Sequence, residues 1–227
     1  MTDRRTTARL AGGLFLLTHV TSVGAVLLYG PGGTDPAGRL GGRGPVLAGA
    51  LLEVVLAVAV VGTAVALYPL VRERGHGSAT AYVALRTLEA AVILTGVVAL
   101  LPVVADPGSA ATAGLDPGVA RAFVGVHAWT FLVGPGLVCP VNTVVLAWLL
   151  HRDHLVPRPV TLLGLVGGPL IGLVNLAVLA GLTSTLAVAA LPIFAWEVSL
   201  AVVLITRGLP TAPVRTGDRS RTLAPTG

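Results

Sequence analysis

The chain has 227 residues, of which 54% are hydrophobic and only 11% are charged. Soluble globular domains carry about a quarter charged residues, so this composition excludes most soluble enzymes, and its apolar content excludes a disordered protein. The formal net charge is +5, and all fifteen basic residues are arginines. These arginines lie in short clusters between apolar segments, so we expect no nucleic acid as a partner. The composition indicates a membrane protein, with the lipid bilayer as its surroundings.

Six apolar segments are each long enough to cross a bilayer, which takes about 20 residues. In chain order they cover residues 8–29, 46–70, 79–104, 120–150, 159–183 and 186–207. The first apolar segment continues to Tyr29, so we expect an uncleaved helix rather than a signal peptide. Residues 208–227 are rich in Pro, Thr and Arg and lack apolar periodicity, which predicts a disordered cytoplasmic tail. The pattern predicts one all-α domain over residues 1–207, a polytopic integral membrane protein with a six-transmembrane-helix bundle.

The arginines are divided unevenly between the two sides of this predicted bundle. If the N-terminus lies inside, the inner segments hold eleven arginines and the outer loops hold three, Arg39, Arg43 and Arg121. Membrane proteins concentrate positive charge in their cytoplasmic loops. We therefore expect both termini of this multi-pass protein to be cytoplasmic.

The fourth segment is too long for a single upright crossing, and prolines interrupt it. Gly134, Pro135 and Gly136 stand in the middle, and Pro140 follows. Proline removes a backbone donor and clashes with the preceding turn, which predicts a kinked or broken fourth helix near the middle of the bilayer. Broken helices are tolerated only against protein or a wet cavity, so this region points to a site.

The fifth segment carries Gly164, Gly168 and Gly172 at four-residue spacing, and Asn175 continues the same helical face. Such a glycine ridge lets helix backbones approach closely in lipid. We favour packing within the bundle, and an oligomer formed through these three glycines is the alternative.

Ionisable and polar residues inside the predicted spans are the most informative feature. A charged side chain at a helix centre costs about 3 kcal/mol on insertion scales, so such residues face the bundle interior and have partners. The strongest candidates for ligand binding or proton relay are Glu53, Arg86, Glu89, His127 and Glu197, followed by His19, Tyr82 and Asn142.

The third segment shows the arrangement best. Tyr82, Arg86 and Glu89 stand at i, i+4 and i+7, which stacks them along one face, and Arg86 and Glu89 are close enough to pair. At a rise of 1.5 Å per residue, Glu89, Glu197 and His19 all come near the middle of the bilayer. We therefore expect an intramembrane Glu/Arg/His cluster.

The charges of this cluster do not balance if every group ionises. Three carboxyl groups, Glu53, Glu89 and Glu197, accompany a single guanidinium, Arg86. We predict that at least one of the three carboxyl groups is protonated at neutral pH, which infrared spectroscopy across a pH titration would test. Arg86 then either holds an anionic group of a ligand or balances the carboxylates.

Three functions fit such a cluster. The first is a small carrier or binder of a proton-coupled or lipophilic ligand. The second is a membrane-embedded enzyme that uses a glutamate or His127 as acid–base, and the third is a scaffold or regulatory subunit in which the cluster is structural. His19 and His127 also suggest axial haem ligands, but nothing else in the sequence supports haem. We expect no cofactor and, without a zinc-binding motif, no metal.

Several blocks of the chain are distinctive in their order and spacing. They are Gly49–Glu53, Ala84–Ala91, Val126–Gly136, Leu163–Pro169 and Ala195–Glu197. Together they resemble the bacterial membrane-protein family called domain of unknown function 4386, over about residues 8–207. The resemblance implies a six-helix protein of the bacterial cytoplasmic membrane and supplies no activity. It places Glu53, Arg86, Glu89, His127 and Glu197 in the family's recurring blocks. Ala128 departs from the family, where an aspartate is common, so the resemblance supports no His–Asp pair there.

Overall fold

The computed structural model describes residues 4–29, 43–104, 116–184 and 186–210. Every element in these ranges is helical: α1 (Arg4–Tyr29), α2 (Arg43–Val71), α3 (His76–Val104), α4 (Pro117–Val133), the π-helical η1 (Gly134–Val138), α5 (Cys139–Arg152), α6 (Arg158–Leu179), the 3-10 helix η2 (Ala187–Ala190) and α7 (Leu191–Thr206). The described residues contain six helical spans that are long and apolar enough to cross a membrane. The fourth of these spans is formed by α4, η1 and α5 together. The predicted all-α, six-span, multi-pass membrane protein is confirmed. Of the predicted disordered tail, residues 211–227 lie outside the described residues.

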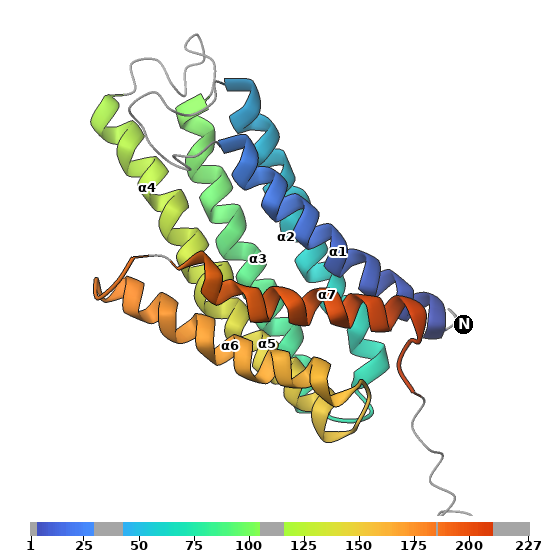
Figure 1. Ribbon diagram of the computed structural model, residues 1–227. Helices are drawn as coiled ribbons and strands as arrows, with labels where there is room; N and C mark the ends of the chain where they lie inside the picture. Colours follow the sequence, from blue (N-terminus) through green and yellow to red (C-terminus); the bar gives the residue numbers. More distant parts are fainter. Residues whose placement is uncertain (1–3, 30–42, 105–115, 185, 211–227) are drawn as a thin grey trace, which may run out of the picture.

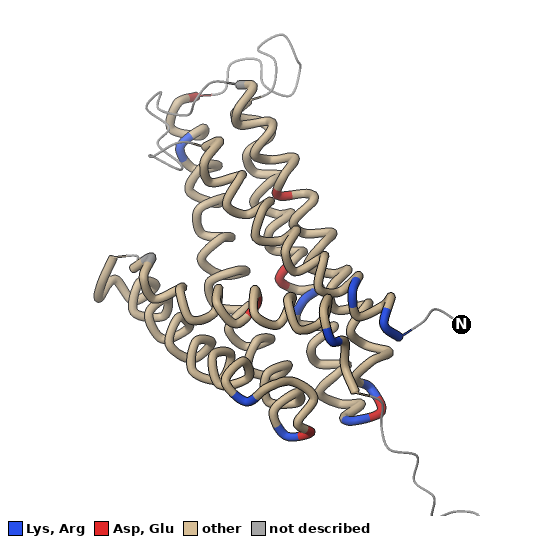
Figure 2. The backbone as a smooth tube through the Cα atoms, turned by 45° about the vertical axis from the view of Figure 1, so that its right-hand side comes forward, with Lys and Arg blue, Asp and Glu red and all other residues tan. Residues whose placement is uncertain are grey.

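The helices are not all parallel (Figure 1). α2, α3 and α4 run side by side, α1 packs on α2, and α6 and α7 cross the others at one end of the bundle. α7 packs between α1 and α6, and α5 packs between α3 and α6. Most of the described arginines gather at the same end (Figure 2), which we call the arginine-rich end; it carries the α2–α3 and α5–α6 turns.

The fourth span changes its helix type where the prolines stand. α4 ends at Val133, and the α-helix resumes only at Cys139, with η1 between them. Pro140 has no N–H, so the carbonyl of Gly136 lacks the partner that an α-helix would give it. The side-chain amide of Asn175 on α6 donates to this carbonyl at 2.9 Å. The predicted kink of the fourth helix is confirmed, and a neighbouring helix satisfies the carbonyl that the proline leaves unpaired.

The glycine ridge of α6 packs inside the bundle. A Cβ atom at Gly164 would lie 2.7 Å from the Trp196 ring on α7, and one at Gly168 would lie 3.0 Å from the carbonyl oxygen of Pro140 on α5. Gly172 has more room, because its Cβ would lie 3.4 Å from Pro140 Cβ. α6 can therefore approach α5 and α7 this closely only because these glycines have no side chain. An oligomer through these glycines stays a prediction.

The outer surface of the bundle is apolar. Large side chains such as Leu27, Val58 and Leu173 are 75%, 67% and 66% exposed. Lipid tails are the surroundings that suit such a surface, whereas a water-soluble monomer rarely exposes large contiguous apolar patches. Charged side chains in the middle of these helices therefore turn inward.

Candidate functional site: a buried ion cluster beside an intramembrane cavity

Arg86 of α3 is the centre of the first cluster, and it is 3% exposed. Its Nε donates to the Tyr82 hydroxyl at 3.1 Å, Nη1 donates to Glu89 Oε2 at 3.3 Å, and Nη2 donates to Glu197 Oε1 at 2.8 Å. Tyr82 and Glu89 come from the same face of α3, whereas Glu197 comes from α7, 111 positions further along the chain. The guanidinium therefore joins two helices through two carboxylates.

Neighbouring side chains complete the surroundings of Arg86. Asn142 on α5 donates through its amide to Glu89 Oε2 at 2.7 Å. The rings of Phe15 and Tyr82 lie 5.3 Å and 5.6 Å from the guanidinium carbon, within the range of cation–π attraction. The charge of Arg86 is thus compensated by two carboxyl groups and by two aromatic rings beneath the guanidinium carbon.

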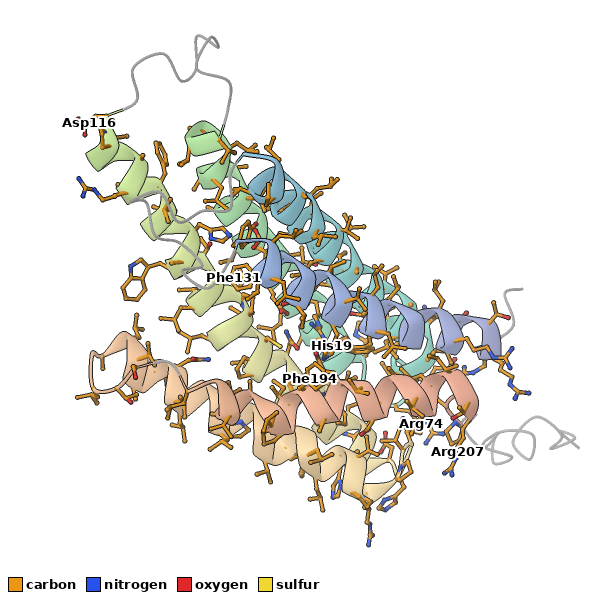
Figure 3. All side chains as sticks on the ribbon, turned by 45° about the horizontal axis from the view of Figure 1, so that its top comes forward. His19, Arg74, Asp116, Phe131, Phe194 and Arg207 are labelled. Carbon is orange, nitrogen blue, oxygen red and sulfur yellow. The ribbon has the colours of Figure 1, made fainter. Side chains whose placement is uncertain are left out.

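His19 of α1 extends this cluster on the cavity side. Its Nε2 lies 3.5 Å from Glu197 Oε2, and its Nδ1 lies 2.8 Å from the carbonyl oxygen of Phe15. Figure 3 shows His19 beside Phe194 of α7, and the two ring centroids are 4.5 Å apart. Because a carbonyl oxygen can only accept, the hydrogen of a neutral His19 stands on Nδ1. A proton must then lie either on Nε2 or on Glu197 for the two groups to attract each other.

Glu53 and His127 form a second cluster. His127 Nε2 on α4 lies 3.0 Å from both carboxyl oxygens of Glu53 on α2, and Glu53 is fully buried. The Tyr29 and Phe131 rings flank the imidazole, with centroids 5.3 Å and 5.6 Å away. Within the described residues, His127 Nδ1 has no hydrogen-bond partner.

The structure therefore divides the candidate residues between two places. Six of the eight, Tyr82, Arg86, Glu89, Asn142, Glu197 and His19, belong to the first cluster, and no hydrogen bond or ion pair between described residues joins it to Glu53 and His127. His19 and His127, considered above as haem ligands, thus have different partners. Across the described parts of the chain, no three His, Cys, Asp or Glu side chains converge as metal ligands would.

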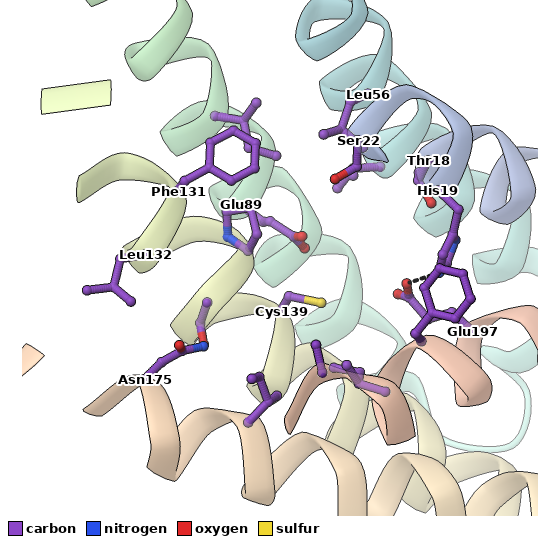
Figure 4. A pocket seen from close by; sticks show the side chains of 18 of the residues that line it. Thr18, His19, Ser22, Leu56, Glu89, Phe131, Leu132, Cys139, Asn175 and Glu197 are labelled. Atoms are coloured by element: carbon purple, nitrogen blue, oxygen red, sulfur yellow. Dashed lines mark hydrogen bonds and ion pairs between the residues drawn. The ribbon is translucent and has the colours of Figure 1, made fainter. Parts of the chain in front are cut away.

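A cavity of about 600 Å³ opens beside the first cluster. Figure 4 shows Phe131 and Leu132 of α4 on one side of it and His19 and Ser22 of α1 on the other, with Glu197 below His19. Arg86 and Glu89 on α3 also line it, together with apolar side chains from α2, α6 and α7. The cavity thus has apolar walls, and its floor is formed by the ionisable side chains His19, Arg86, Glu89 and Glu197.

The rim of the cavity is apolar. Val23 on α1, Trp129 on α4 and Phe194 on α7 all line it and are 51%, 53% and 46% exposed. All three residues belong to helices that are long and apolar enough to span a membrane. The cavity therefore opens sideways, toward the lipid that surrounds the bundle.

The aromatic walls of the cavity are not among the residues predicted from the sequence. Phe131 stands four residues after His127, and Phe194 stands three residues before Glu197. At these spacings each phenylalanine shares a helix face with a candidate residue. That spacing is the signal that could have identified them.

Comparison with known proteins gives a family but no activity. No curated protein and no solved structure gives a significant match to this chain. The model of the family described as domain of unknown function (DUF4386) matches residues 10–208, which include both clusters and the whole cavity. The chain therefore belongs to the DUF4386 family.

Proposed function

We propose that this protein is a membrane-embedded carrier or binding protein for a lipophilic ligand. The observation that carries the proposal is the cavity of about 600 Å³, which combines apolar walls with an ionisable floor. Ligand sites in proteins commonly have volumes of about 300–1,000 Å³, apolar walls and a few convergent polar groups. The cavity meets each of these criteria.

The arrangement of the cavity favours an amphipathic ligand. Its apolar part packs against Leu132, Phe131 and Phe194, and its polar group approaches the edge formed by His19 and Glu197. These two residues are the more exposed members of the cluster, with side chains 14% and 13% exposed, against 3% for Arg86. A ligand therefore meets His19 and Glu197 before it meets the guanidinium.

The ligand reaches the cavity from the bilayer. The rim is made of apolar side chains, including Val23 and Trp129, so a lipid-dissolved molecule enters without crossing a charged surface. A proton held between His19 and Glu197, which are 3.5 Å apart, would couple ligand binding to pH.

The same proposal includes the orientation of the protein. The arginine-rich end faces the cytoplasm of a bacterium and both termini lie there, because the positive charges of membrane proteins concentrate on that side. A fluorescent protein fused after Gly227 is then fluorescent, and alkaline phosphatase fused at the same place is inactive. The reverse pattern contradicts this orientation.

Binding of 1-pyrenemethanol, a neutral lipophilic alcohol, tests the function. Pyrene accepts excitation energy from tryptophan, and Trp129 stands on the cavity rim, so saturable energy transfer in purified protein reports occupancy. We expect Ala128→Phe, at the rim, to weaken the saturable binding by about tenfold or more, equivalent to about 1.4 kcal/mol. Ala122→Phe, at an exposed position on the same helix outside the cavity, is the control. The proposal fails if no saturable binding occurs, or if both variants bind like the original protein.

A further inference from the structure

We infer that the ligand is a lipophilic monocation, such as an amine or an onium ion, that exchanges with the proton shared by His19 and Glu197. The inference rests on the proposed function and names the ligand class of the same cavity. Three observations carry it: the enclosure of Arg86, the charge balance of the first cluster, and the aromatic walls.

Arg86 is already paired with two carboxyl groups of the protein itself. Each of its three nitrogens already donates a hydrogen bond, to Tyr82, Glu89 and Glu197. Its guanidinium carbon lies over the rings of Phe15 and Tyr82, and the residue is 3% exposed. Of the two roles considered for this arginine, balancing the carboxylates is the one that the geometry supports.

The charge balance of the first cluster leaves room for one cation. With a proton shared between His19 and Glu197, two positive charges match the two carboxylates of Glu89 and Glu197. Without that proton, one negative charge is left at the floor of the cavity, and a monovalent cation restores neutrality. An anion would instead add an uncompensated charge to a site of low dielectric constant.

Several titratable groups face the His19–Glu197 pair. They are Tyr82, Arg86 and Glu89 on α3 and Cys139 on α5. Arg86 is the one permanent cation among them, and Glu89 offsets it. The proton of the pair is therefore the charge that a ligand can replace.

The walls suit a cation with apolar substituents. Phe131, Phe194 and Trp129 line the cavity, and the faces of aromatic rings attract cations, most strongly in tryptophan. A bulky organic cation thus gains apolar contacts from the walls and an opposite charge from the floor. A small hydrated metal ion gains only the charge.

Tetraphenylphosphonium and tetraphenylborate provide the test, because they are nearly identical in shape and opposite in charge. Isothermal titration of both ions into purified protein, with Ala128→Phe as the reference for unspecific uptake, gives the specific affinities. We expect the phosphonium to bind at least about tenfold more tightly than the borate. A tenfold ratio of affinities corresponds to about 1.4 kcal/mol, which is less than the attraction between two unit charges at close range inside a protein. Titrations in buffers with different ionisation enthalpies count the protons, and we expect about one released for each phosphonium bound.

Two variants test whether the phosphonium affinity and the proton release depend on Glu197. Glu197→Gln lowers the phosphonium affinity by about tenfold or more and abolishes the proton release, whereas Glu73→Gln, at an exposed position outside the cavity, changes neither. If Glu197→Gln does not fold, the original protein still decides, because exchange with one proton makes the phosphonium affinity rise with pH, by up to about tenfold per pH unit.

Equal or tighter binding of the borate, or binding without proton release, overturns the cation inference. If 1-pyrenemethanol still binds in that case, the proposed function survives; if no probe binds, the proposed function fails as well.

Discussion

The substitution Arg86→Met tests whether the first cluster balances buried charges. Methionine keeps much of the apolar length of arginine but removes the three hydrogen bonds to Tyr82, Glu89 and Glu197. Glu89 then stays buried without a counter-charge, and Glu197 keeps only His19 as a partner, so we expect the free energy of unfolding to fall by about 3–5 kcal/mol, the range for losing one partner of a buried ion pair. The assay is a titration of the purified protein with sodium dodecyl sulfate in mixed micelles, followed by tryptophan fluorescence.

Two further variants test the reason for this loss. The triple variant that combines Arg86→Met with Glu89→Gln and Glu197→Gln removes the unpaired charges together with their partner, so we expect it to regain at least half of the lost free energy. Arg121→Met, at an exposed position on α4, is the control and should stay within about 0.5 kcal/mol of the original protein. A loss of less than about 1 kcal/mol for Arg86→Met, the upper range for an exposed pair, would contradict a buried ion cluster. A triple variant less stable than the single one would contradict it as well.

The same titration checks two predictions on α6. Asn175→Leu leaves the carbonyl of Gly136 without its donor, and we expect a loss of about 1–3 kcal/mol; unchanged stability would contradict the role given to this amide. Gly164→Ala forces a methyl group against the Trp196 ring and should cost about 1–3 kcal/mol. Gly172→Ala, on the same ridge, meets only ordinary contact distances and should change stability by less than about 0.5 kcal/mol, so equal losses at the two glycines would contradict the packing described here.

Features that depend on one helix at a time could be predicted from the sequence. Hydropathy and length are properties of a single segment, so all six spans were identified. The kink in the fourth span was also predicted, because Pro140 removes a hydrogen bond within its own helix. The stacking of Tyr82, Arg86 and Glu89 follows from the helical repeat in the same way.

Features that depend on which helices are neighbours could not be predicted. His127 and His19 both stand in apolar helices, yet His127 bonds to Glu53 on α2 and His19 faces Glu197 on α7. The choice depends on the rotation of each helix about its axis and on the steep crossing of α6 and α7. The cavity has the same origin, because its walls come from helices that are far apart in the sequence.

Photolabelling shows whether a lipophilic molecule occupies the cavity between α1, α4 and α7. A derivative of 1-pyrenemethanol that carries a diazirine is irradiated with the protein in liposomes, and mass spectrometry locates the attached residues. We expect attachment at Phe131, Leu132 and Phe194, and we expect excess unmodified 1-pyrenemethanol to suppress it there. Attachment confined to outward residues such as Leu27 and Leu173, and insensitive to the competitor, would contradict occupation of the cavity.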